Sequence, residues 1–256
     1  MTEKCVRLEV NEKVALVTLD RPPVNALSRE MRYQLVATFD EISARDDIMC
    51  AVLTGNGSVF CAGADLKDRP RDDVPGDFLE HNRITRETGN AIRECAKPVI
   101  AAVNGAALGA GMGLAAACDI LYASDNATFG MPEINVGLAG GASMLRTLLG
   151  RSTTRRMFFS GDRLSAHDLL RRNVLEDVLP PEELLPVTMA LAQRIASKAP
   201  LALVYAKRAT NMVDVMPQRD AYRFEQEFTM TLSKTEDARE ARMAFLEKRA
   251  PQFKGR

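Results

Sequence analysis

The chain has 256 residues, of which 46% are hydrophobic, and its 34 basic and 34 acidic residues give a formal net charge of zero. This length fits one domain, or one domain with a helical extension. The lack of a strongly basic tract argues against a nucleic-acid partner, and no apolar run is long enough to span a membrane. Five scattered cysteines without a CxxC pair and an N-terminus without a signal-peptide pattern predict a reduced, cytoplasmic protein. With only two histidines, no metal site is expected.

The N-terminal part of the chain has a strand-strand-helix pattern. Apolar residues alternate over 6–10 and run continuously over 14–19, which predicts a β-hairpin. Ser28 is a candidate N-cap, because apolar residues follow it at helical spacing over 31–42. These residues form a first ββα unit.

A second unit of the same order follows. Short apolar runs at 51–53 and 59–61, separated by an Asn-Gly turn, predict two strands. Residues 67–77 are charged and interrupted by proline and glycine, which predicts a surface loop. A helix is expected over 78–95.

The most distinctive stretch of the sequence is rich in glycine and runs over 97–141. An apolar strand at 99–103 leads into a glycine turn, and a small-residue helix at 114–118 and a strand at 120–123 follow. Such a turn lets backbone N–H groups approach a ligand, and a helix N-terminus directs free N–H groups and a positive dipole towards it. The stretch therefore predicts either a site for developing negative charge or a tightly packed strand-to-helix turn.

Beyond the glycine-rich stretch the pattern becomes helical. Residues 143–172 are basic and predicted to be helical, 174–179 predict a last strand, and 182–246 are almost entirely helical. Helix starts are suggested by Pro181, Pro200 and Ser233. Strands alternating with helices, followed by a helical tail, indicate the α/β class. We divide the chain into a core, 1–195, and a C-terminal helical region, 196–256.

The sequence contains neither the common nucleotide-binding motifs nor the nucleophile motif of hydrolases. The glycine spacing is G-x-G-x-G, with Leu114 at the position where the dinucleotide-binding motif has its last glycine. No G-K-[ST] sequence marks a phosphate-binding loop, and Ser143 lacks the second glycine of a nucleophile elbow.

Glu133 is the most informative acidic residue. It follows Pro132 at an expected helix start and lies among apolar residues, so its pKa should be raised and it could act as an acid or base. The alternative is a first-turn glutamate that only serves the helix dipole. His81 is a weaker candidate. Three basic residues of the charged loop are expected to be solvated, although one could meet a phosphate; they are Lys67, Arg69 and Arg71.

A second turn, at 61–65, is also rich in alanine and glycine. If the fold brought this turn next to the glycine turn at 105–113, the two backbones could offer two N–H groups to one oxyanion. Such a pair of donors stabilises an enolate or a tetrahedral intermediate.

These motifs resemble the crotonase, or enoyl-CoA hydratase/isomerase, superfamily over essentially the full length. The matching segments are FCAGADLK (60–67), KPVIAAVNGAALGAG (97–111), AACDILYA (116–123), FGMPEINVGL (129–138) and the tail FLEKRAPQFKGR (245–256). The resemblance implies a crotonase-like spiral of ββα units with a C-terminal helical trimerisation region, assembled as a homotrimer or a hexamer. It implies an acyl-CoA thioester as the substrate and no separate cofactor, since coenzyme A is carried on the substrate.

The same resemblance implies roles for individual residues. The N–H groups of Ala64 and Ala110 would bind the thioester carbonyl, with alanine at the second position where the family commonly has glycine. Phe245 and Lys248 match tail positions that reach the coenzyme A site of a neighbouring subunit. The other predicted coenzyme A-binding residues are Ala62, Asp65, Leu66, Lys67 and Gly109.

The chain departs from the two-glutamate hydratases of this family at Gly113. Glu133 matches the second glutamate, whereas the first falls at Gly113, which has no side chain. Hydratase is the commoner family activity, but one glutamate suits an isomerase or lyase better. The alternatives left open are other chemistry of the fold, such as a hydrolase or dehalogenase using His81 or Asp65, and a degenerate subunit that only binds coenzyme A.

Overall fold

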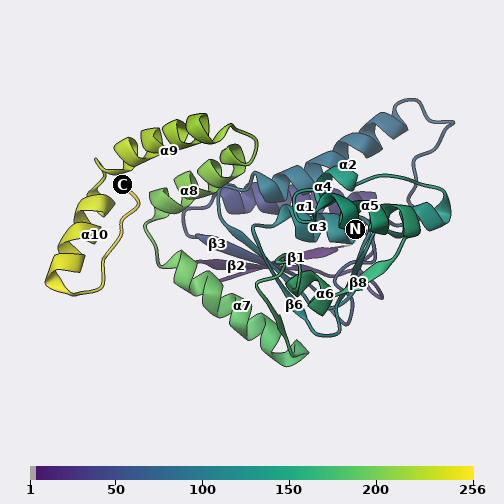
Figure 1. Cartoon of the computed structure of the whole chain (residues 1–256), viewed down its shortest axis with the longest axis horizontal. Coiled ribbons are helices and arrows are strands. Elements are labelled where there is room, and N and C mark those ends of the chain that lie inside the picture. Colours follow the sequence, from purple (N-terminus) through teal and green to yellow (C-terminus); the bar gives the residue numbers. More distant parts are fainter. Residues whose placement is uncertain (1–3) are drawn as a thin grey trace.

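A six-stranded sheet lies at the centre of the computed structural model, which describes residues 4–256 (Figure 1). Its strands, in spatial order, are β1 (Val6–Asn11), β2 (Val14–Leu19), β3 (Cys50–Gly55), β4 (Val99–Val103), β6 (Ile120–Ser124) and β9 (Asp177–Leu179). β1 and β2 are antiparallel, so the predicted hairpin is confirmed, and each later pair is parallel. Parallel neighbours need long crossovers; the first three contain the helices α1 (Arg29–Ala44), α2 (Asp77–Arg93) and α3 (Ala110–Ala117).

A second, smaller sheet consists of β5 (Ala107–Leu108), β7 (Thr128–Gly130) and β8 (Arg163–Ser165). Cys61 extends it through an isolated bridge to Ala107. The large-sheet strands β3, β4 and β6 are therefore each followed by a short segment in or beside the small sheet. This repeated order confirms the predicted α/β spiral.

Alternate residues of the central strands face two hydrophobic cores. On β3, Ala51 and Leu53 pack on the side that carries α1, whereas Cys50 and Val52 pack with α7 (Pro181–Ala196). Successive side chains of a strand point to opposite faces of its sheet, and helices cover both faces of a parallel sheet. The central strands are for this reason buried along their length instead of alternating between apolar and polar residues.

Several predicted boundaries are wrong. Residues 59–61 form no strand, because only Cys61 pairs. The predicted helical stretch 143–172 is divided among α4 (Ala142–Leu145), α5 (Arg151–Ser160), β8 and α6 (Ala166–Leu170). Gly161 ends α5 in a left-handed conformation, with φ +69°, which favours glycine. The last strand begins at Asp177 instead of residue 174, since only the three residues of β9 pair with β6.

Most helix starts are confirmed. The Ser28 hydroxyl caps α1 by accepting a hydrogen bond from the Met31 N–H (3.2 Å), and α8 (Pro200–Val213) begins at the predicted proline, as α7 does. Ser233 is instead the C-cap of α9 (Gln218–Leu232). Thr235 caps α10 (Glu236–Glu247) by accepting a hydrogen bond from the Ala238 N–H (3.1 Å), so the sequence signal lies two residues too early.

The last helices leave the core. Figure 1 shows α9 and α10 (yellow-green to yellow) arching away from the sheet, with α8 as the link. Lys207 of α8 is buried, and its ammonium group pairs with the Asp119 carboxylate (2.5 Å), which also accepts a hydrogen bond from the Val99 N–H (2.7 Å). The pair anchors α8 to the sheet. The division into residues 1–195 and 196–256 stays a prediction.

Two further observations concern the whole described chain. None of its helices is both long and apolar enough to cross a membrane. All five cysteines are buried thiols.

Candidate active site

Glu133 lies at the start of the 3₁₀ helix η1 (Pro132–Val136), directly after β7. Its side chain is half-buried, and its Oε2 atom has no hydrogen-bond partner within residues 4–256. Loss of solvation raises the pKa of this carboxyl above its ordinary value. The direction agrees with the expectation from its apolar surroundings, and it favours a group that can exchange a proton nearer neutral pH.

The fold brings the two alanine- and glycine-rich turns together. Leu108 donates a backbone hydrogen bond to the Cys61 carbonyl (2.9 Å). A β-carbon on Gly63, where φ is +102°, would lie 2.9 Å from the Leu108 carbonyl oxygen and 3.7 Å from the Ala110 nitrogen. The close approach of these two backbones therefore requires glycine at residue 63.

The N–H groups of Ala64 and Ala110 are both available to a ligand. Leu27 donates to the Gly63 carbonyl (2.8 Å) and accepts from the Asp65 N–H (3.0 Å), so the bridge to Leu27 leaves the Ala64 N–H unused. Ala110 begins α3, whose first turn has N–H groups without a partner in the helix. Neither N–H has an acceptor within the described part of the chain.

The Glu133 carboxylate lies against Gly109, the residue that precedes Ala110. The Gly109 N–H donates to the Gly130 carbonyl (2.8 Å), which ties the end of β5 to the end of β7. A β-carbon on Gly109 would overlap Oε1 of Glu133 and lie 3.2 Å from its Cδ. The carboxylate is thus next to the residue that precedes one of the two N–H donors.

Gly113 lies one turn further along α3, and Met144 of α4 occupies the space beside it. The Met144 sulfur is 2.9 Å from the position of a β-carbon on Gly113. A cavity of about 270 Å³ adjoins the two residues, and α2 contributes Arg86, Asn90 and Arg93 to its lining. No carboxylate is among the residues that line this cavity, and Glu133 itself lies outside its lining.

Asp65 is engaged in holding its own loop. Its carboxylate accepts a hydrogen bond from the Lys67 N–H (2.9 Å) and pairs with the Arg21 guanidinium (2.9 Å). The Lys67 N–H is the main cause of the lowered pKa of Asp65. These contacts favour a structural role over that of a base. Leu66 (59% exposed) and Lys67 project from the loop, and the half-buried Ala62 donates its N–H to the Val24 carbonyl (3.0 Å).

His81 lies on α2 and faces basic residues. Burial lowers the pKa of its imidazole, and the nearby positive charges of Arg32 and Arg29 lower it further. These arginines belong to α1. His81 Nδ1 and Glu133 Oε2 are both buried without a hydrogen-bond partner in the described part of the chain, so no hydrogen bond joins these two atoms.

Phe245 and Lys248 are not near the other predicted residues. α10 lies at one end of the molecule, away from the main body that contains α3 (Figure 1), and Phe245 is 82% exposed. Within one subunit the structure does not bring them together with Ala64, Ala110 and Glu133. Their contact with the site of a neighbouring subunit stays a prediction.

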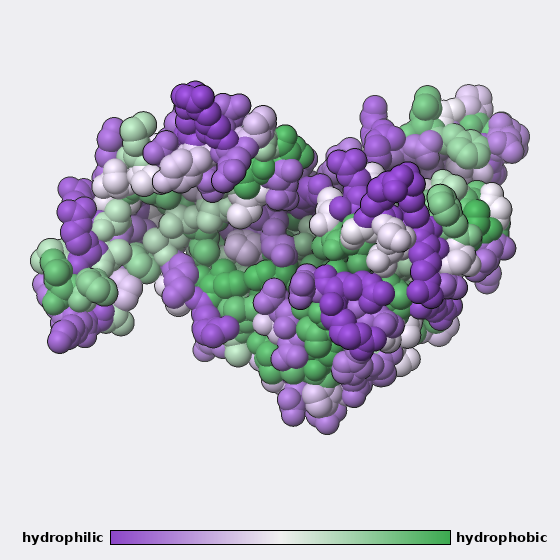
Figure 2. Space-filling view, in the orientation of Figure 1, coloured by the Kyte–Doolittle hydropathy of each residue, from purple (hydrophilic) through white to green (hydrophobic). Residues whose placement is uncertain are grey.

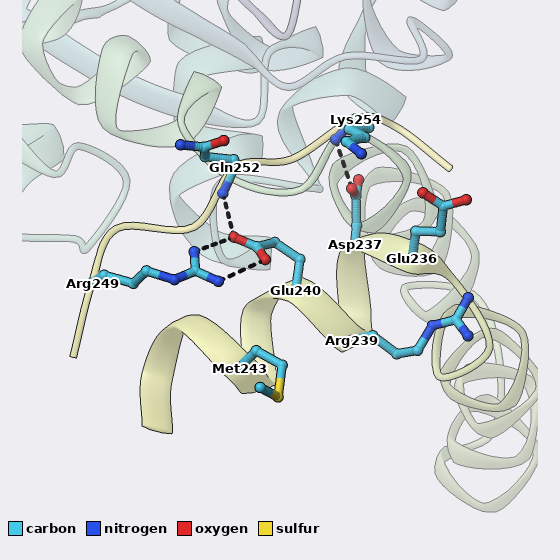
Figure 3. A pocket seen from close by; sticks show the side chains of 8 residues that line it. All are labelled: Glu236, Asp237, Arg239, Glu240, Met243, Arg249, Gln252 and Lys254. Atoms are coloured by element: carbon cyan, nitrogen blue, oxygen red, sulfur yellow. Dashed lines mark hydrogen bonds and ion pairs between the residues drawn. The ribbon is translucent and has the colours of Figure 1, made fainter. Parts of the chain in front are cut away.

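A larger hollow of about 500 Å³ lies between α10 and the C-terminal tail, and the residues that line it hold the tail in place (Figure 3). Its carboxylates are already engaged. Glu240 pairs with the Arg249 guanidinium (2.9 Å) and accepts from the Gln252 N–H (2.8 Å), while Asp237 accepts from the Lys254 N–H (2.7 Å). This hollow is remote from Glu133 and is not part of the candidate site.

Apart from Gly113, the residues that line the smaller cavity were not predicted from the sequence to belong to the site. Gly89, inside α2, was the available signal, because glycine in a helix costs about 1 kcal/mol relative to alanine and suggests a close approach. The Met144 methyl group is 3.6 Å from the position of a β-carbon on Gly89. No cluster of three or more His, Cys, Asp or Glu side chains suited to a metal ion occurs in the part of the chain described.

Comparison with known proteins shows the family of the chain. The model of the family "Enoyl-CoA hydratase/isomerase" matches residues 9–256. The chain is 36% identical to 2,3-dehydroadipyl-CoA hydratase of Escherichia coli over 96% of both chains, and 36% identical to (E)-benzylidenesuccinyl-CoA hydratase of Thauera aromatica over 98% of this chain and 99% of that one. A solved structure of enoyl-CoA hydratase subunit I from Geobacillus kaustophilus superposes with a TM-score of 0.91 at 35% identity, covering 99% of both chains. The chain belongs to the enoyl-CoA hydratase/isomerase family.

Proposed function

We propose that the protein shifts a proton within an enoyl-CoA thioester, with Glu133 as its single acid and base. The observation that carries this proposal is the position of the Glu133 carboxylate against Gly109, next to the unused N–H of Ala110. If the thioester oxygen binds the N–H groups of Ala64 and Ala110, the α-carbon of the acyl group would lie near this carboxylate.

The reaction follows from these positions. The Glu133 carboxylate removes a proton from the α-carbon of a 3-enoyl thioester, and the electron pair of that C–H bond delocalises into a dienolate. The two N–H groups stabilise the negative oxygen, and one such donor is typically worth about 10²–10³ in rate. The protonated Glu133 then returns the proton to the γ-carbon, which leaves the double bond conjugated with the thioester.

Gly113 favours isomerisation over water addition. Hydration needs one group to activate water and another to deliver a proton to carbon, and the cavity beside Gly113 has no acidic residue for the first task. Hydration is the second candidate, because the two curated relatives described above are both named hydratases.

Burial of Glu133 argues against a subunit that only binds coenzyme A. A carboxylate with an unpartnered, buried oxygen destabilises the folded protein, and a role in catalysis would explain why this chain carries it. The coenzyme A part of the substrate is expected at Ala62, Leu66 and Lys67, with Phe245 and Lys248 supplied by a neighbouring subunit of a homotrimer or hexamer. The exposure of Leu66 and Phe245 in one chain supports this arrangement.

The decisive experiment compares the wild type with Glu133→Gln on 3-hexenoyl-CoA and 2-hexenoyl-CoA. Mass spectrometry reports the addition of water, and ultraviolet absorbance reports conjugation without a mass change. We expect conjugation of 3-hexenoyl-CoA by the wild type and a loss of about 10²–10⁴ in the variant, the usual contribution of general acid–base catalysis. Hexanoyl-CoA should bind both proteins with similar affinity, since glutamine is nearly isosteric.

A matched control is Glu87→Gln on the surface of α2, which should keep wild-type activity. Retention of most activity by Glu133→Gln would show that the catalytic assignment is wrong. A gain of one water without any conjugation of 3-hexenoyl-CoA would select hydration instead.

A further inference from the structure

The cavity beside Gly113 exists because two glycines face the same space from different helices. Gly89 of α2 and Gly113 of α3 are both in contact with the side chain of Met144, at 3.6 Å and 2.9 Å from the positions of their missing β-carbons. Methionine is flexible and adapts to irregular space. The residues therefore leave a cavity of about 270 Å³ that is partly filled by a movable side chain.

One wall of this cavity is cationic. Arg86, Asn90 and Arg93 lie at helical spacing on α2 and line it together, and none of its lining residues is acidic. Neither arginine side chain has an ion pair or hydrogen-bond partner within residues 4–256. Some arginines of the chain, such as Arg45 and Arg249, are paired with carboxylates. Others, such as Arg83, have no ion pair in the described part of the chain and differ from Arg86 and Arg93 in lying outside the cavity. The two guanidinium groups at the cavity are thus available to an anion.

We propose that this cavity binds the distal end of the acyl group, and that this end carries a carboxylate. The inference rests on the proposed function, because that function places the thioester carbonyl at Ala64 and Ala110. Gly113 is one turn of α3, roughly 6 Å, beyond Gly109. An acyl chain that passes Glu133 and follows α3 from Gly109 would meet the cavity at Gly113, which lines it.

The basic and amide side chains of this wall favour a carboxylate at the end of the acyl group. Guanidinium groups bind carboxylates through paired N–H donors in one plane, and the Asn90 amide offers a further donor. A hydrocarbon terminus would gain nothing from these groups, because the three side chains are exposed and would keep their contact with water. Met144 moves aside to admit the chain, and it then packs against the methylene groups.

The experiment measures binding of three saturated thioesters, which have no double bond to react. Hexanoyl-CoA, adipyl-CoA and the ω-methyl ester of adipyl-CoA are titrated by calorimetry into the full-length protein. We expect adipyl-CoA to bind at least about fivefold more tightly than either neutral ligand, the size suited to two partly exposed ion pairs. The preference should shrink as salt increases.

The double variant Arg86→Gln/Arg93→Gln should reduce the ratio of adipyl-CoA to hexanoyl-CoA affinity to about one. The matched control is Arg83→Gln, which removes a positive charge from α2 outside the cavity and should keep the preference. Equal affinity of the wild type for all three ligands, or an unchanged preference in the double variant, would overturn the inference.

These outcomes are separable from failure of the proposed function. If adipyl-CoA and hexanoyl-CoA bind equally while 3-hexenoyl-CoA is still conjugated, only the inference about the acyl terminus is wrong. If adipyl-CoA is preferred but no enoyl thioester reacts, the cavity assignment stands and the catalytic proposal is wrong.

Discussion

The carboxylate of Glu133 occupies the space beside Gly109 in which any other residue would carry its β-carbon. Gly109 also has φ +54°, a left-handed conformation that favours glycine. We expect Gly109→Ala to displace the carboxylate and to lower kcat/KM by about 10²-fold, because a misplacement of about 1 Å can have that effect. Steady-state kinetics on protein shown to be folded by circular dichroism checks this.

The control for this substitution is Gly140→Ala. A β-carbon there would meet no heavy atom within 4 Å, and the backbone is not left-handed. This variant should keep both the activity and the melting temperature of the wild type. Equal activity of the two alanine variants would mean that the contact between Gly109 and Glu133 is irrelevant to catalysis.

Because the pKa of Glu133 is raised, activity should increase with pH while the contribution of this residue to stability decreases. Burial raises this pKa above its value in the unfolded chain, so the folded protein favours the protonated form. Its contribution to stability is therefore fully present below the unfolded-state pKa of about 4.5. The contribution is lost as pH rises through the folded-state pKa. Glu133→Gln should accordingly be more stable than the wild type at pH 8, with a difference that shrinks towards acid pH.

Urea unfolding of both proteins across this pH range measures the difference. The activity of the wild type should rise with pH through an apparent pKa above 4.5, because proton removal requires the carboxylate form. A wild type more stable than Glu133→Gln at pH 8 would contradict the assigned burial.

The backbone conformation of Gly113 is one that a residue with a side chain can adopt. The residue is helical and its φ is not positive. The obstacle is the Met144 sulfur. We expect Gly113→Glu to raise the ratio of water addition to isomerisation, and Gly113→Glu/Met144→Ala to raise it further.

Rates of water addition to 2-hexenoyl-CoA and of conjugation of 3-hexenoyl-CoA give this ratio, with Met144→Ala alone as the control. The two neighbouring carboxylates should raise one another's pKa, so the acid limb of the activity profile moves to higher pH. A folded double variant with the wild-type ratio would refute the idea that the missing carboxylate decides the product.

How much of this site the sequence could predict depends on the range of the contacts. The ββα order, the Ser28 cap and the direction of the Glu133 pKa shift follow from local patterns, because each depends on neighbours within a few residues. The partner of Asp65 could not be predicted, since Arg21 comes much earlier in the chain and only the fold brings the two together. Met144 was missed for the same reason.

Local signals also misled where they were ambiguous. The run at 59–61 is apolar like a strand, yet it is buried as a connection and only Cys61 pairs. The stretch 143–172 has the composition of a helix. Gly150 and Gly161 flank α5, however, and the two glycines divide the stretch into short segments. Glycine at helix ends was the stronger signal there.

The C-terminal helices predict assembly in multiples of three. They and α7 expose large hydrophobic side chains, and Figure 2 shows hydrophobic residues gathered in the middle of one face. The exposed residues include Leu185, Val187, Met212, Val215, Tyr222 and Met230. Patches of this kind mark interfaces. Sedimentation at micromolar concentration should show a trimer or hexamer; a stable monomer would contradict the prediction.

The burial of all five cysteines has a consequence for a protein that handles unsaturated thioesters. Such compounds are electrophiles that alkylate thiolates at the β-carbon. Burial raises the pKa of Cys50 and of Cys61 to about 12, and it raises the pKa of Cys95 and Cys118 as well. These groups stay as unreactive thiols at neutral pH, so prolonged exposure to enoyl-CoA should leave the mass of the protein unchanged.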